Sequence, residues 1–289
     1  MQRLIAGEVP TDEELAEYLV AFHRDVPAAT PSVFGRLRDG QGRTSYEIIA
    51  RRCALEVREG AAKLLDVGCG DGAAVPALRT ALPAADICGI DLSAEEIARA
   101  RAAYADARTS FVQARAQRLP FAAASFDAAV SHMALMLVQP VSPAFAELAR
   151  VLRPGASLTF VIGTLTALSG DLAALISAAQ RFMHGRFPGL IFRSTGDARM
   201  NDETGLRDVL AGNGLKLSDC TDFEVSGDLS AQEVLGLFEK TYVFGSLHER
   251  DRDLLHAELC VRFCELAAGR GTVHVRMPLR LGSASAAGH

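Results

Sequence analysis

Short apolar runs alternate with helical stretches between about residues 60 and 160, and this alternation constrains the fold more than any other feature of the sequence. Residues 62–67 (AKLLDV) are predicted to form a buried strand that ends at three closely spaced glycines, Gly68, Gly70 and Gly72. Further strands are predicted at 86–91, 110–113, 126–131 and 157–162. Helices are predicted between them at 73–82, 93–105 and 143–152. Such alternation predicts a parallel sheet covered by helices on both faces.

The pattern changes after residue 163. A helix is predicted at 171–184, and a loop with several Gly and Pro residues follows to residue 200. The later elements are predicted to be a helix at 201–211, a strand at 215–225, two helices within 230–268 and a strand at 272–281. We therefore expect an N-terminal helical segment (1–45), an α/β domain (46–281) with helical insertions at about 164–200 and 230–268, and a flexible tail (282–289).

Composition limits the classes of function. The 289 residues are 49% hydrophobic and 22% charged, as in a globular protein, and the net charge of −5 argues against binding to nucleic-acid phosphates. The apolar stretch 128–138 is shorter than the roughly 20 residues that span a bilayer, and no secretory signal opens the sequence. The six cysteines contain no C-x-x-C pair. We expect a cytoplasmic enzyme with reduced thiols, no metal, and neither nucleic-acid nor membrane partners.

Glycines and acids at the ends of the first two predicted strands indicate a ligand site. Glycine lets a ligand approach the backbone closely at the turn after the first strand, here at Gly68 and Gly70. Asp66 precedes this turn, and Asp91 ends the second strand 25 positions later (91 − 66). A carboxylate at that distance can accept a hydrogen bond from each hydroxyl of a ribose. The carboxyl edge of the sheet is therefore predicted to bind a nucleoside cofactor.

Four segments in the same order carry a family resemblance: LLDVGCGDG (64–72), GIDLS (89–93), RLPFAAASFDAAV (118–130) and LARVLRPGASLTFV (148–161). Together they resemble the small-molecule branch of the class I S-adenosylmethionine-dependent methyltransferases, over about residues 62–163. The resemblance implies a Rossmann-like α/β fold with a seven-stranded, mostly parallel sheet whose last strand is antiparallel. The predicted strands at 215–225 and 272–281 fit its sixth and seventh strands. It also implies S-adenosylmethionine as cofactor and S-adenosylhomocysteine as product.

The same resemblance implies roles for individual residues. Gly68 and Gly70 would make room for the methionine and ribose portions of the cofactor, and Asp66 would orient its amino group. Asp91 would bind the ribose, and Leu92 would line the adenine.

The adenine end departs from the family pattern. In the family, the loop after the third strand often reads G-D-A, and its acid accepts a hydrogen bond from the adenine amino group. Here the matching stretch is Ala114-Arg115-Ala116, which has no acid. Two alternatives remain: backbone groups near Ala116 and Gln117 bind the adenine, or Arg115 stacks on the ring.

Two residues upstream of the first strand are candidates for the methionine end of the cofactor. In related enzymes an aromatic residue and an arginine from this region cover that end, which implies such roles for Tyr46 and Arg43. Tyr46 would face the sulfonium or ammonium, and Arg43 would pair with the carboxylate. The alternative is an ordinary helix N-terminus with an exposed arginine.

The end of the fourth predicted strand supplies a candidate general base. Ser131 is assigned to the cofactor-binding residues, and His132 directly follows it at the carboxyl edge. The unperturbed pKa of histidine, about 6.5, suits removal of a proton at neutral pH. The alternative is a packed, hydrogen-bonded histidine with no chemical role.

Other acid–base candidates have structural interpretations that we favour. His184 lies in the first insertion and is expected on a surface loop. Glu239 and Tyr242 lie on a predicted helix whose apolar spacing is typical of core. Residues 248–253 (HERDRD) are expected to form a solvated turn between helices rather than a metal site.

The leading hypothesis is a methyltransferase for a small molecule, in specialised-metabolite biosynthesis, acting as a monomer or homodimer. Residues 1–45, 164–200 and 230–268 would form a lid over the site. One alternative keeps the cofactor and changes the reaction, for example to an intramolecular cyclase or lyase that forms an azetidine ring and releases methylthioadenosine. Another is a non-catalytic binding protein of the same fold. The acceptor and the choice among O-, N- and C-methylation stay open.

Overall fold

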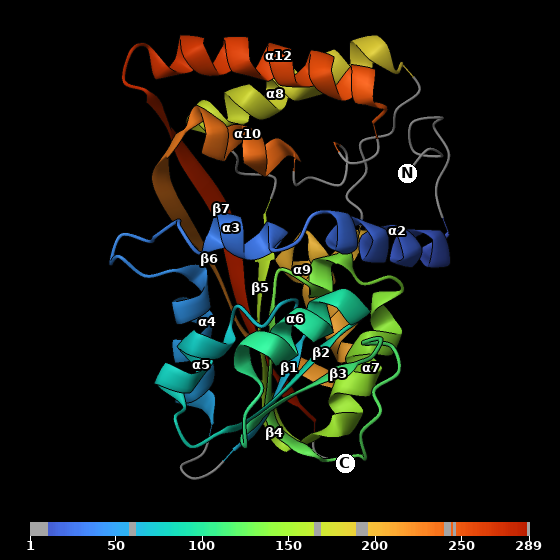
Figure 1. Cartoon of the computed structure of the whole chain (residues 1–289). Coiled ribbons are helices and arrows are strands. Elements are labelled where there is room, and N and C mark those ends of the chain that lie inside the picture. Colours follow the sequence, from blue (N-terminus) through green and yellow to red (C-terminus); the bar gives the residue numbers. More distant parts are fainter. Residues whose placement is uncertain are drawn as a thin grey trace.

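The computed structural model describes residues 11–57, 62–164, 169–188, 196–239, 244 and 247–287. Its centre is a seven-stranded sheet with the strand order β3-β2-β1-β4-β5-β7-β6 (Figure 1). The strands are β1 (Lys63–Val67), β2 (Asp86–Asp91), β3 (Thr109–Gln113), β4 (Phe126–His132), β5 (Leu152–Gly163), β6 (Leu215–Ser230) and β7 (Thr272–Ala286). β1 to β5 are parallel, and β7 lies antiparallel between β5 and β6. The predicted Rossmann-like α/β fold is confirmed.

Helices cover both faces of the sheet. One face packs against α4 (Ser45–Glu56), α5 (Val75–Ala81) and α6 (Ala94–Tyr104), and the other against α7 (Val141–Val151) and α9 (Glu203–Ala211). Successive side chains of a strand point to opposite faces, so Leu64 joins the first apolar core and Leu65 the second. Two short 3-10 helices, η1 (Leu135–Leu137) and η3 (Ala198–Met200), complete this part of the chain.

Two N-terminal helices, α2 (Asp12–Asp25) and α3 (Ala29–Phe34), cross the carboxyl edge of the sheet (Figure 1). α2 begins with a capping box, in which Thr11 Oγ1 accepts a hydrogen bond from the backbone N–H of Glu14 and the Glu14 carboxylate accepts one from Thr11 N–H. Arg99 of α6 donates to the carbonyl oxygen of His23 at 3.0 Å, which ties the end of α2 to the domain.

The insertions form a separate helical layer. It consists of α8 (Gly170–Arg186), α10 (Ala231–Glu239) and α12 (Glu249–Ala267), which lie at the far end of the long β6–β7 ladder, beyond α2 and α3 (Figure 1). Arg186 of α8 pairs with the buried Asp251 of α12 at 2.8 Å. Residues 248–253 therefore form the N-cap and first turn of a helix, so the predicted turn is wrong, although all of them except Asp251 are exposed as expected.

The C-terminus differs most from the sequence-based expectation. β7 continues through Ala286, so residues 282–286 are strand and the prediction of a flexible tail from residue 282 is wrong there. Ser283 and Ala284 are each 1% exposed, and Gly282 is paired with Phe160 of β5. Small residues are typical of tails, but here they let β7 pack closely against its neighbours, as at Gly282, where a Cβ would overlap the ring of Phe160.

Candidate active site

The turn after β1 is built from glycines with left-handed backbone. Gly68, Gly70 and Gly72 have φ of 69°, 53° and 86°, a region that other residues rarely adopt. A Cβ atom at Gly68 would lie 2.2 Å from the Cβ of Ala134, whereas none would meet an atom within 4 Å at Gly70. The backbone N–H groups of Gly68 and Cys69 both donate to the carbonyl oxygen of Ile90, at 2.8 and 2.9 Å. The turn is therefore held against the end of β2 with open space beside Gly70.

Asp91 ends β2 beside this turn. Its Oδ2 accepts a hydrogen bond from the backbone N–H of Gly70 and its Oδ1 one from that of Ser93, each at 2.9 Å. Ser93 in turn caps α6, because its Oγ accepts from the N–H of Glu96 at 3.2 Å. The carboxylate thus has a fixed orientation at the carboxyl edge, and its remaining lone pairs are available to a ligand.

Asp66 is a buried carboxylate with an unused oxygen. It is 1% exposed, and its Oδ2 has no hydrogen-bond partner among the described residues. Burial, and next the charge of Asp91, raise the pKa of Asp66 to about 7. Buried polar atoms are nearly always paired in proteins, so this oxygen indicates a place for a ligand or a water molecule.

The raised pKa of Asp66 predicts a pH-dependent stability in the ligand-free protein. The native state holds this proton up to about pH 7, whereas an unfolded aspartate loses it near pH 4, so stability should fall as pH rises between these values. The difference between the pKa of Asp66 in the native state and in the unfolded state corresponds to a loss of unfolding free energy on the order of 4 kcal/mol. Urea unfolding at pH 4.5 and pH 8 should show this loss in the native sequence and not in Asp66→Asn. Equal losses in both proteins would contradict it.

His132 lies at the end of β4 in an aromatic environment. Its ring stacks on Tyr46, with centroids 4.1 Å apart at 28°, and meets the ring of Phe34 edge-on at 5.5 Å and 79°. The Nε2 atom lies 2.8 Å from Oγ of Ser45. Burial lowers the pKa of His132 to about 3, so the near-neutral titration expected from the sequence is wrong. The next residue, Met133, turns the chain with a left-handed backbone at φ 57°.

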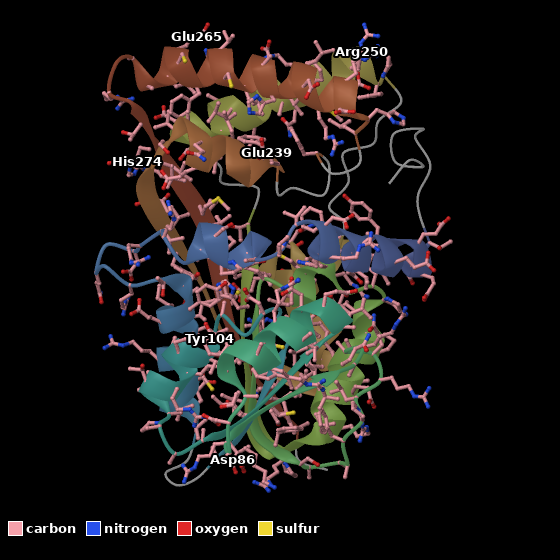
Figure 2. All side chains as sticks on the ribbon, viewed as in Figure 1. Asp86, Tyr104, Glu239, Arg250, Glu265 and His274 are labelled. Atoms are coloured by element: carbon pink, nitrogen blue, oxygen red, sulfur yellow. The ribbon has the colours of Figure 1, made fainter. Side chains whose placement is uncertain are left out.

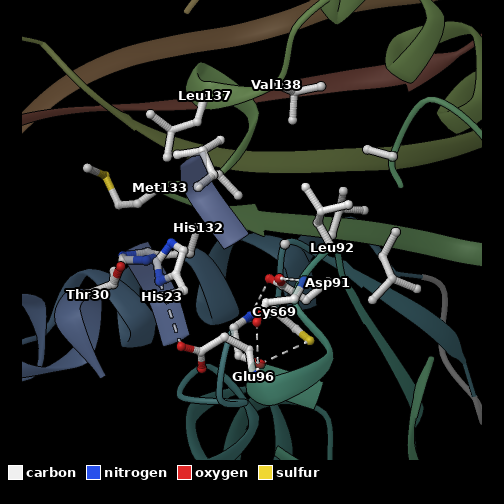
Figure 3. Close-up of a pocket in the computed structure, with 18 of the residues that line it drawn as sticks. His23, Thr30, Cys69, Asp91, Leu92, Glu96, His132, Met133, Leu137 and Val138 are labelled. Atoms are coloured by element: carbon white, nitrogen blue, oxygen red, sulfur yellow. Dashed lines mark hydrogen bonds and ion pairs between the residues drawn. The ribbon is translucent and has the colours of Figure 1, made fainter. Parts of the chain in front are cut away.

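These groups share one pocket with α2 and α3 (Figure 3). The empty space within it, including open solvent at its mouth, is about 1280 Å³. The polar floor is formed by the turn after β1, Asp66, Asp91 and His132. The remaining lining is mostly apolar and comes from α2, α3 and the segment after β4, through Leu15, Leu19, Val20, Pro31, Leu137 and Val138. Polar lining residues lie among these apolar ones, namely Asp12 and His23 of α2, Thr30 of α3 and Glu96 of α6.

The family model described as a methyltransferase domain matches residues 65–160. A malonyl-[acyl-carrier protein] O-methyltransferase of Hahella chejuensis is 38% identical over 102 residues, which are 35% of this chain and 37% of that enzyme. The chain spans 37% to 64% of the length of five curated O- and C-methyltransferases that it matches. An uncharacterised protein of Mycobacterium tuberculosis is 30% identical over 214 residues, which are 71% of this chain and 74% of that protein.

The chain belongs to the class I S-adenosylmethionine-dependent methyltransferases. The fold agrees with solved structures, among them that of the [4+2]-cyclase SpnF, at a TM-score of 0.57 and 19% identity over 97% of this chain and 98% of that chain. Among the helices of the described residues, none combines the length and apolar composition that a membrane span requires.

Most of the residues that the family resemblance assigns to the cofactor lie together in the structure. Those that line the pocket are Tyr46, Asp66, Gly68, Gly70, Asp91, Leu92, Ala116 and Gln117, and His132 lies among them. Arg43 and Ser131 do not line it. Both nitrogens Nε and Nη2 of Arg43 donate to Oδ2 of Asp39, and Oγ of Ser131 donates to the carbonyl oxygen of Val67 at 2.9 Å. Their side chains are thus engaged elsewhere, in a loop and in the sheet.

The part of the pocket near the loop after β3, where the resemblance would place the adenine, contains an ion pair that could not be seen in the sequence. Arg115 lines the pocket, and its two terminal nitrogens donate to both carboxylate oxygens of Glu13 at 2.9 and 2.6 Å. This pair connects the start of α2 to the loop after β3. Gln117 is likewise engaged, since its side-chain N–H donates to the carbonyl oxygen of Gln139 at 2.9 Å.

The remaining candidates lie away from the pocket. His184 is on α8, so it belongs to a helix and not to the expected surface loop. Glu239 is the last residue of α10, 3.6 Å from Nε2 of His256, and lies in the helical layer (Figure 2). Tyr242 is outside the described residues. Within the described parts of the chain, no three His, Cys, Asp or Glu residues are grouped as a metal site requires.

Of the three segments predicted to form a lid, only the N-terminal one, through α2 and α3, lines the pocket among the described residues, and the lid role stays a prediction. Residues 12–31 contribute to the pocket, whereas the described residues of 169–188, 196–239 and 247–287 do not. The sequence carried a usable signal for α2, because Thr11 and Glu14 form a capping-box pattern ahead of apolar residues at 15, 19 and 22.

Proposed function

We propose that this methyltransferase binds S-adenosylmethionine at the turn after β1 and methylates a small molecule in the apolar compartment beneath α2. The donor set fits the cofactor. The unpaired Oδ2 of Asp66 suits an ammonium group, and Asp91 suits ribose hydroxyls. Gly70 leaves space for close approach to the backbone.

The proposal of a small-molecule acceptor rests on one observation, that a single pocket contains both the proposed cofactor residues and apolar side chains of α2 and η1. The same cavity that contains Gly70 and Asp91 is lined by Leu15 and Leu19 of α2 and by Leu137 of η1. An apolar compartment beneath a helix suits a compact acceptor better than a polymer, which needs an open groove. A role in specialised-metabolite biosynthesis is part of the same proposal.

The cofactor, when bound, supplies an activated methyl group on a positively charged sulfur. The residues of the chain then contribute mainly position and exclusion of water, which give large rate effects when the reacting atoms are held in line. The apolar side chains of α2 cover the compartment. Burial, followed by the charges of Asp71 and Asp66, raises the pKa of Tyr46, so its hydroxyl stays protonated beside the site.

The test is product analysis with S-adenosylmethionine carrying a labelled methyl group. The protein is incubated with the cofactor alone, with a panel of small phenols and keto acids, and separately with bulk protein and RNA. With the native protein we expect S-adenosylhomocysteine and a labelled small molecule. With Gly68→Val, in which the added side chain would overlap Ala134, we expect neither product.

Each other result contradicts a stated part of the proposal. Labelled protein or RNA would contradict the acceptor class. Methylthioadenosine formed without an acceptor would favour the cyclase or lyase alternative. Failure to bind S-adenosylmethionine would contradict the cofactor, and binding without turnover in any sample would favour a non-catalytic role.

A further inference from the structure

Ser45 and His132 form an isolated buried pair. Ser45, the first residue of α4, is 0% exposed, and its Oγ lies 2.8 Å from Nε2 of His132. His132 is 7% exposed and lines the pocket. Its other nitrogen, Nδ1, is buried and has no hydrogen-bond partner among the described residues. The imidazole thus has one nitrogen held by the protein and one buried nitrogen whose hydrogen-bonding capacity is unused by the described residues.

The pair has two possible proton arrangements, and they differ in the number of unsatisfied groups. If Nε2–H donates to Ser45, the serine proton has no acceptor among the described residues, and the Nδ1 lone pair is also unused. If the Ser45 hydroxyl donates to Nε2, both of these atoms are satisfied and only Nδ1–H is left over. Each arrangement leaves one buried donor without an acceptor among the described residues, but the first also leaves the Nδ1 lone pair unused. The second arrangement, which has fewer unsatisfied groups, is therefore preferred.

Two rings keep the imidazole in this orientation. Tyr46 lies against one face of His132, and Phe34 meets it edge-on. Burial lowers the pKa of His132 to about 3, so the ring is neutral at physiological pH and carries a single proton. The position of that proton is therefore decided by the hydrogen bond at Nε2.

We propose that Ser45 is a positioning residue that holds His132 as an Nδ1–H donor, directed to an oxygen of the methyl acceptor. This inference rests on the proposed function for the identity of its ligand. A ring whose Nδ1 already carries a proton does not remove one, so His132 binds the acceptor rather than deprotonating it. The acceptor would carry a carbonyl oxygen or an oxyanion, such as a phenolate or carboxylate, near the reacting atom.

The experiment reads the proton directly, by ¹⁵N NMR of protein labelled at histidine, with and without S-adenosylhomocysteine. Between pH 6 and pH 8 we expect Nδ1 of His132 to give a protonated signal and Nε2 an unprotonated one, with this form in at least about fivefold excess. His132→Asn identifies the signals. A predominant Nε2–H form, or a doubly protonated ring, would overturn the proposal.

Variants at position 45 test the role of the serine. Ser45→Ala removes the donor to Nε2, so the fivefold preference should be lost, and Ser45→Thr, which keeps a hydroxyl, should restore it. An unchanged preference in Ser45→Ala would show that another group positions the ring. If Ser45→Ala does not fold, Ser45→Cys serves, since its weaker S–H donor should reduce the preference.

The ¹⁵N NMR measurements do not depend on whether the protein transfers a methyl group. Loss of the Nδ1–H form overturns the role of Ser45 even in an active enzyme. Conversely, the expected signals in a protein that never forms S-adenosylhomocysteine would confirm the proton position and contradict the proposed function.

Discussion

Replacing Asp91 with alanine is expected to weaken the binding of S-adenosylhomocysteine by about 10-fold or more, measured by isothermal titration calorimetry. The carboxylate stands at the end of β2 with lone pairs left for ribose hydroxyls. Hydrogen bonds to a charged group contribute about 1.5–3 kcal/mol, and about 1.4 kcal/mol corresponds to tenfold. Asp91 also accepts a hydrogen bond from the N–H of Gly70, so its loss should loosen the turn after β1.

A matched control separates this effect from loss of an acid in the same strand. Asp86 begins β2 and lies at the opposite end of the sheet from α2 (Figure 2). Asp86→Ala should leave the affinity within about twofold, because it is far from any ligand contact. An affinity of Asp91→Ala equal to that of Asp86→Ala, with both proteins folded, would contradict the ribose assignment.

Asp91→Ala could weaken binding because a direct contact with the ribose is lost or because the turn after β1 loosens. An analogue without the ribose hydroxyls distinguishes these two causes. The native protein should bind the 2′,3′-dideoxy analogue of S-adenosylhomocysteine about 10-fold or more weakly than the parent compound, because two donors to the carboxylate are missing. Asp91→Ala should bind the two compounds with nearly equal affinity. If it still discriminates between them as well as the native protein does, the hydroxyls contact another residue.

The parallel half of the fold and the floor of the site could be predicted because both depend on local sequence. A buried strand followed by glycines places Asp66, Gly68 and Gly70 at the carboxyl edge in any parallel sheet. The next strand places Asp91 beside them through the same rule. Each of these positions follows from strand polarity and turn chemistry, without knowledge of distant contacts.

The residues that were misassigned depend on partners that strand polarity does not specify. From the sequence, Arg43 was expected to pair with the carboxylate of a ligand. In the structure it pairs instead with Asp39, four residues earlier in the same loop. The pKa of His132 depends on Phe34 and Tyr46 packing around it from α3 and α4. Arg115 is paired with Glu13, about a hundred positions away. The pairing of Arg43 is local to its loop, whereas tertiary docking of α2 and α3 decides the surroundings of His132 and Arg115.

Deleting residues 282–289 is expected to lower the stability of the protein severely or to prevent folding. The sequence suggests a dispensable tail, but residues 282–285 pair with β5 on one side, and residues 282–286 pair with β6 on the other. Their loss would expose the edge of β5 next to the buried Leu158 and Phe160, and would leave backbone groups of both neighbouring strands without partners. Thermal unfolding followed by circular dichroism measures the effect. A deletion variant with an unchanged Tm would show that these residues are not part of the sheet.

A substitution at Gly282 tests the same prediction, that residues 282–286 belong to the sheet, without shortening the chain. A Cβ there would lie 2.2 Å from the ring of Phe160, so Gly282→Val must displace a fully buried aromatic side chain. Overpacking of this kind typically destabilises by about 1–3 kcal/mol, or about 2–12 °C in Tm for a chain of this size. Gly236→Ala is the control, because a Cβ at that position of α10 meets nothing within 4 Å and alanine favours a helix. The control should keep or raise Tm, whereas equal Tm values for the two variants would place Gly282 outside the core.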